Sequence, residues 1–172
     1  ITFREPYLLD SDYFLDTNIF FFERERESYD EERIGGSVAI GQRFGDVWTA
    51  SVQGRAERID ITSIDVDSPL DVFAVAGEST FTSIGFSVTR DTTDSSIFPT
   101  RGSRLTFDLS RVGGLGGNYD FTSVTAKWQK FWIVDQDFFE RKTIVVLRTQ
   151  TGYIFENNEA PLFERFYAGG QR

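Results

Sequence analysis

Long segments in which apolar and polar residues alternate one by one restrict most strongly what this chain can fold into. Between Gly102 and Val112, apolar residues such as Leu105 and Phe107 alternate with polar ones such as Arg104 and Asp108. Successive residues of a β-strand face opposite sides, so this segment is predicted to be a strand with one apolar and one polar face.

Further segments follow the same rule along most of the chain. They are Ile1–Arg4, Tyr13–Arg26, Ile34–Phe44, Val47–Ile61, Thr80–Arg90, Val124–Gln129 and Thr143–Phe155. Several exceed the about 5–6 residues typical of strands in soluble proteins and reach the roughly 9–11 needed to cross a bilayer. The pattern predicts an all-β, antiparallel, up-and-down sheet. It favours a transmembrane barrel and leaves a soluble barrel or sandwich open as the alternative.

Aromatic residues flank the segment around Val124–Gln129. Tyr119 and Phe121 precede it, and Phe131 and Trp132 follow it. Aromatic side chains gather at both membrane–water interfaces of transmembrane barrels. The sequence therefore predicts that these residues mark the two interfaces.

Composition excludes several classes of function. The chain has no Cys and no His, so disulfides, Cys/His zinc sites and His-dependent catalysis are excluded, and no cofactor or metal is expected. Its net charge of −9 argues against nucleic-acid binding, which needs a basic face. Apolar runs such as Ile19–Phe22 are too short for a membrane helix. Since the chain begins at Ile1 and contains no Met, it is expected to be processed or cut from a longer one.

Three groups of residues have functional interpretations that a simpler one outweighs. The run Gly113–Gly117 lacks the Lys-Ser/Thr of a phosphate-binding loop, so a turn is predicted. Asp65, Asp67 and Asp71 lack the spacing of a calcium loop, so a solvated acidic loop is predicted. Glu57 and Asp108 lie on polar faces and could act as a pair of glycosidase carboxylates. Ion pairing on the polar face is favoured, with Arg55 or Arg104 as the expected partner.

Two segments are more specific. The first, Ile97–Gly102, ends in Pro99, Thr100, Arg101 and Gly102 and is predicted to form a hairpin turn. The second, Pro161–Gly170, follows a strand and places Phe166 and Tyr167 shortly before Gly169 and Gly170. A loop this rich in apolar side chains is expected to pack against another part of a protein.

Both segments resemble those of the BamA-type outer-membrane assembly family, also called the bacterial surface antigen family. Its members carry a Pro-Thr-Arg/Lys-Gly turn and a Phe-Tyr-x-Gly-Gly approach to a long loop. The segments Glu5–Leu9 and Arg33–Gly36 also resemble stretches of that family. The motifs occur in family order along essentially the whole chain.

The resemblance implies about eight strands from the middle of a sixteen-strand barrel. Residues 1–154 would supply barrel strands and turns, and 155–172 the start of an extracellular loop that folds into the lumen. The resemblance implies that Phe166, Tyr167, Gly169 and Gly170 position this loop, with Lys127, Arg148 and Gln150 facing the lumen as contacts. The family's docking Arg would lie beyond Arg172. Turns at 6–12, 44–46, 91–102 and 134–142 would face the periplasm.

The function implied is assembly and insertion of β-barrel proteins in the cell outer membrane, without a catalytic residue or a nucleotide. Expected partners are nascent outer-membrane proteins, the lipid bilayer and accessory lipoproteins that bind periplasmic domains outside this chain. One alternative is a related transporter, either TamA-like or a two-partner secretion pore. An alternative of another class is a soluble β-barrel or sandwich that binds a ligand.

Overall fold

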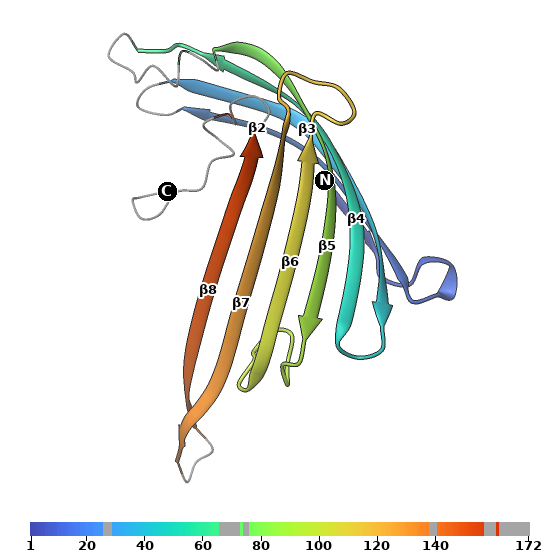
Figure 1. Cartoon of the computed structure of the whole chain (residues 1–172), viewed down its shortest axis with the longest axis vertical. Helices are drawn as coiled ribbons and strands as arrows, with labels where there is room; N and C mark the ends of the chain where they lie inside the picture. The colour runs from blue at the N-terminus through green and yellow to red at the C-terminus, as the bar shows by residue number, and fades with distance from the viewer. Residues whose placement is uncertain (26–28, 66–72, 74–75, 138–140, 157–160, 162–172) are drawn as a thin grey trace.

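The computed structural model describes residues 1–25, 29–65, 73, 76–137, 141–156 and 161 (Figure 1). These residues form eight strands and one short 3-10 helix, Leu8–Asp10. The strands are β1 (Thr2–Glu5), β2 (Tyr13–Glu25), β3 (Asp30–Phe44), β4 (Trp48–Thr62), β5 (Gly77–Asp91), β6 (Gly102–Val112), β7 (Phe121–Gln136) and β8 (Lys142–Glu156). The predicted strands are confirmed; β3, β5 and β7 extend several residues beyond the predicted ranges, and the bounds of the other strands differ by at most one residue at each end.

All eight strands form one antiparallel sheet in sequence order, β1 through β8. The sheet is strongly curved and open, and its connections alternate between its two ends (Figure 1). The predicted up-and-down fold is therefore confirmed, in the form of a barrel segment. The described strands form this one sheet and do not pack as the two sheets of a sandwich. No helix among the described residues is long and apolar enough to cross a membrane.

The register assigns every strand residue to one of two faces, because directly paired residues share a face. One face carries exposed apolar side chains such as Ile40, Val52 and Phe86, which are 46%, 47% and 43% exposed. We call it the outer face. The opposite face, the inner face, carries the polar partners of the alternation, such as Asp108 and Lys127.

At the end of the sheet that carries the β4–β5 connection, the two faces exchange their character. There the inner face carries a buried apolar cluster of Ile59, Ile61, Phe81, Val112 and Phe121. The outer face at the same level carries charged residues, including an ion pair between Arg58 and Glu78 at 3.3 Å. Here the apolar side chains stabilise the sheet from within while the outer face is suited to water.

The prediction that aromatics at the two ends of β7 mark membrane interfaces is largely wrong. Phe121 and Phe131 lie on the inner face and are only 1% and 5% exposed, and Tyr119 packs against the buried cluster. Trp132 is the member of the set on the outer face, at 40% exposure. Phe121 and Phe131 are separated from Lys127 by even numbers of residues along β7, so they share the inner face with it.

The glycine-rich turn between β6 and β7 folds along the edge of β5. Strand β5 extends further than β6 at this end, which leaves backbone groups of Thr80 and Thr82 without a strand partner from β6. Gly113 N donates to Thr82 O at 2.9 Å, and Asn118 N donates to Thr80 O at 2.9 Å. The side chain of Asn118 accepts from Thr80 N at 2.6 Å. The predicted turn is confirmed, and it also covers an exposed strand edge.

Candidate functional site

The inner face carries a series of ion pairs that connect neighbouring strands. Arg4 of β1 binds Asp16 of β2 at 2.6 Å, and Arg104 of β6 binds Asp91 of β5 at 2.6 Å. Lys127 of β7 approaches Asp108 of β6 at 3.3 Å. Each of these pairs joins a cation on one strand to a carboxylate on the neighbouring strand.

Of the two predicted ion pairs, one is confirmed and one is wrong. Arg55 Nη2 lies 2.6 Å from Glu57 Oε1, as predicted. Asp108 does not bind Arg104. It instead accepts from Ser87 Oγ at 2.7 Å and pairs with Lys127. Arg104 and Asp108 are four residues apart on one strand, about 13 Å at a rise of about 3.3 Å per residue, so cross-strand partners are closer.

The most buried charges form a cluster at the level of the apolar core. The side chain of Glu57 is 0% exposed and that of Glu31 is 2% exposed. Arg33 forms an ion pair with Glu31, and its Nη1 lies 3.7 Å from Glu57 Oε1. The guanidinium of Arg55 lies 4.9 Å from the ring centroid of Phe81, which is within cation–π range. Within the part of the chain that the structure describes, Glu57 Oε2 has no hydrogen-bond partner.

The three residues expected to face the lumen all lie on the inner face. Lys127 pairs in register with Gln150, and Gln129 pairs with Arg148. Lys127 is engaged by Asp108, whereas Arg148 has no ion-pair partner among the described residues. The structure thus brings these side chains together on β7 and β8. Their contact with a lumen loop stays a prediction.

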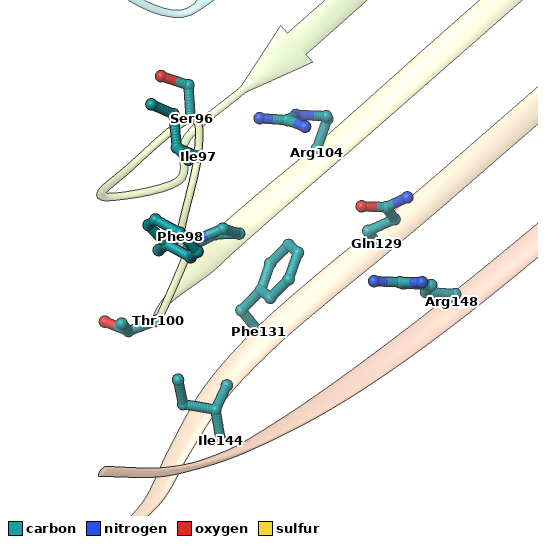
Figure 2. Close-up of a pocket in the computed structure, with 10 residues that line it drawn as sticks. Ser96, Ile97, Phe98, Thr100, Arg104, Gln129, Phe131, Ile144 and Arg148 are labelled. Atoms are coloured by element: carbon teal, nitrogen blue, oxygen red, sulfur yellow. The ribbon is translucent and has the colours of Figure 1, made fainter. Parts of the chain in front are cut away.

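A pocket of about 360 Å³ lies where the β5–β6 connection approaches the inner face (Figure 2). Figure 2 shows Arg104, Gln129 and Arg148 in line across three strands, as the register requires. Apolar side chains from the connection and from the strands complete the lining, namely Ile97, Phe98, Pro99, Phe131 and Ile144. The pocket therefore combines apolar side chains with two guanidinium groups, of which that of Arg104 is already paired with Asp91.

The turn motif Pro99-Thr100-Arg101-Gly102 belongs to this connection and is held by Asp94. One carboxylate oxygen, Oδ1, accepts from Thr100 N at 2.8 Å and from Arg101 N at 3.1 Å, and the hydroxyl of Thr100 donates to the other, Oδ2. These hydrogen bonds hold the pKa of Asp94 well below its usual range. Gly102 has φ +101°, and a Cβ there would lie 2.7 Å from Thr93 Cα. The predicted hairpin turn is thus present, and it requires glycine at its last position.

Replacing Asp94 with Ala is expected to loosen this turn, because two backbone amides and one hydroxyl lose their acceptor. Hydrogen exchange of the Thr100 and Arg101 amides in the full-length protein should accelerate in D94A and less in D94N, which keeps Oδ1. S96A, in the same turn, is the control and should exchange like wild type. Because the pKa of Asp94 is lowered, its stabilisation is present above about pH 4 and is lost only as pH falls well below that value. Unchanged exchange in D94A would contradict this role.

Several predicted residues lie outside the described residues. They are Phe166, Tyr167, Gly169 and Gly170 of the predicted lumen loop, and Asp67 and Asp71 of the predicted acidic loop. The predicted loop segment 155–172 begins inside β8, whose last residue is Glu156. Within the described ranges, no group of three or more His, Cys, Asp or Glu side chains could hold a metal ion.

Sequence reasoning missed Asp94, Glu31 and Gly35. Asp94 lies six residues before Thr100, and an Asp shortly before a Pro-containing turn is a signal for an Asx-type cap that could have identified it. Glu31 shares parity with Arg33 on β3, which could have suggested their pairing. No local signal distinguishes Gly35 from Gly36, because the difference depends on Glu57 of the neighbouring strand.

Comparison with known proteins matches residues 1–172 to the Omp85 superfamily domain. The chain is also similar to the outer membrane protein assembly factor BamA of Nitratidesulfovibrio vulgaris, with 27% identity over 172 residues. That alignment covers 98% of this chain and 21% of the relative, so the chain spans about a fifth of that protein's length. The resemblance to the BamA-type family is confirmed. Because the family match covers the whole chain and the fold is an open up-and-down β-sheet, the chain belongs to the Omp85 superfamily of outer-membrane β-barrel proteins.

Proposed function

We propose that this chain is a central wall segment of an insertase that assembles β-barrel proteins into the outer membrane. The observation that carries the proposal is the similarity to the assembly factor BamA along 98% of the chain. The structure supports it with an apolar outer face and an ion-paired inner face on one curved sheet. Such a wall separates lipid from a polar lumen.

The mechanism proposed for the whole protein involves no covalent step. A barrel of this kind exposes a strand edge elsewhere in its wall, and an incoming strand adds to that edge through backbone hydrogen bonds. The strands described in this chain are paired in order and have the role of scaffold. The buried ion pairs of the inner face resist deformation while the distant edge opens. The partners are nascent outer-membrane proteins and the bilayer, and accessory lipoproteins stay a prediction.

Reconstitution of the full-length protein in liposomes tests this function. A urea-unfolded outer-membrane barrel protein is added, and its folding is followed by the mobility difference between heated and unheated samples on a gel. We expect faster folding than in liposomes with an unrelated porin of similar size. Substituting both Gly169 and Gly170 with bulky residues should reduce the acceleration, if these residues position the lumen loop as the resemblance implies.

The related transporter is the rival outcome of the same experiment. A TamA-like factor or a two-partner secretion pore shares the superfamily but handles a specific cargo. If the full-length protein gives no acceleration with several unrelated barrel substrates and yet releases one soluble cargo across the liposome membrane, the insertase proposal is wrong and the transporter is supported.

A further inference from the structure

The outer face has an apolar depression near the end of the sheet that carries the β3–β4 and β5–β6 connections. Its volume is about 220 Å³, and it lies across β2, β3, β4 and β5. The outer-face side chains of Tyr13, Ile40, Gln42, Val52 and Phe86 line it together with the much smaller Ala50. The short Ala50 side chain between large neighbours creates the depression. Its volume is about seven times the roughly 30 Å³ share of a water molecule, so a segment of hydrocarbon chain fits.

A cation, Arg90, lies on the same face beside the depression, towards the end of the sheet. Arg90 of β5 pairs in register with Trp48 of β4, and its guanidinium lies 5.9 Å from the Trp48 ring centroid. Trp48 is two residues from Ala50, about 7 Å along the strand. Arg90 has no carboxylate partner among the described residues. An amphipathic ring and a free cation thus border an apolar depression.

The surrounding outer face contains no opposing charge. The region extends from the row of paired residues that contains Ile40 to the end of the sheet near Trp132. Within it, the described outer-face positions of β3 to β7 include no Asp or Glu. A second cation on this face, Lys130, lies 5.9 Å from the Trp132 ring centroid. This contrasts with the chain as a whole, whose net charge is −9. The local cations therefore complement an anion held at the membrane surface.

We propose that this part of the outer face is a specific site for a phospholipid with an anionic headgroup. One acyl chain occupies the depression over Ala50, and the headgroup phosphate lies against Arg90 beside Trp48. Because the chain belongs to a superfamily of outer-membrane barrels, its apolar outer face meets lipid. The site requires only this contact, so it is independent of the insertase activity proposed above.

Native mass spectrometry of the full-length protein in detergent tests the site. The probes are phosphatidylglycerol and phosphatidylcholine with identical acyl chains, and the readout is the fraction of protein that retains lipid. A50L fills the depression, and A126L is the matched control because Ala126 lies on the outer face of β7 away from it. R90Q removes the charge and R90K keeps it.

We expect wild type, A126L and R90K to retain phosphatidylglycerol in preference to phosphatidylcholine. R90Q should weaken phosphatidylglycerol binding about fivefold, the effect of one cation at a membrane surface. A50L should also weaken it, because the acyl chain loses the depression that it occupies. Equal retention of the two lipids by wild type would overturn the headgroup assignment. Equal retention of phosphatidylglycerol by A50L and A126L would overturn the acyl-chain site. Lipid retention and liposome folding activity are measured separately, so failure of one proposal is distinguishable from failure of the other.

Discussion

Replacement of Arg55 by Met in the full-length protein is expected to lower the free energy of unfolding by about 3–5 kcal/mol. The Glu57 carboxylate is 0% exposed, and the guanidinium of Arg55 at 2.6 Å is its closest cation. Without it, Glu57 stays buried, and among the described residues its remaining ion-pair partner is Arg33, whose Nη1 lies 3.7 Å from Oε1. The contact of Arg55 with the ring of Phe81 is lost as well.

Urea unfolding of the protein in detergent micelles, followed by tryptophan fluorescence, measures this effect. R58A is the matched control. Arg58 lies on the same strand, but its ion pair with Glu78 is 62% and 58% exposed, so its loss should change stability by no more than about 1 kcal/mol. The double variant R55M/E57M removes both charges and should recover much of the loss. If R55M and R58A have similar effects, the buried pair does not stabilise the wall as proposed.

Replacement of Gly35 by Val is the second change with a large expected effect. Gly35 of β3 pairs directly with Glu57 of β4. A Cβ on Gly35 would meet the Glu57 Cβ and would lie 2.6 Å from the carbonyl oxygen of Ala56. Because one obstacle is backbone, β3 and β4 must move apart. The cost should exceed the about 1–3 kcal/mol typical of overpacking, so little folded barrel is expected.

The same strand pair offers a control. Gly54 of β4 has nothing within 4 Å of its ideal Cβ, so G54V should fold like wild type. The fraction of protein that keeps the compact gel mobility without heating measures folding in both variants. Adding E57A to G35V should not restore folding, because the Ala56 carbonyl still obstructs the new side chain. Normal folding of G35V would show that β3 and β4 adapt more easily than the structure indicates.

Strand positions and faces follow from local patterns. The segment Gly102–Val112 was predicted from alternation, and β6 has the same bounds. Lys127, Arg148 and Gln150 share the inner face, as their parity requires. Alternation of side chains depends on the geometry of one strand alone, so it can be read without knowledge of the neighbouring strands.

Ion-pair partners depend on register. Sliding one strand past its neighbour by two residues keeps every side chain on the same face but changes every cross-strand partner. Alternation therefore placed Asp108 and Arg104 on one face without showing that Lys127 and Asp91 would be their partners. The connections set the register, and the Asp94-anchored turn between β5 and β6 is one that does so.

The sequence by itself determined the all-β class, the antiparallel order, the polar and apolar faces and the superfamily. Only the tertiary structure decided which charges meet, why Gly35 must be glycine, and where the inner face becomes apolar around Ile59 and Phe81. It also decided that Phe121 and Phe131 lie inside. The physical reason is that periodicity is a property of one strand. Partners, close approaches and burial depend on how neighbouring strands are aligned across a curved sheet.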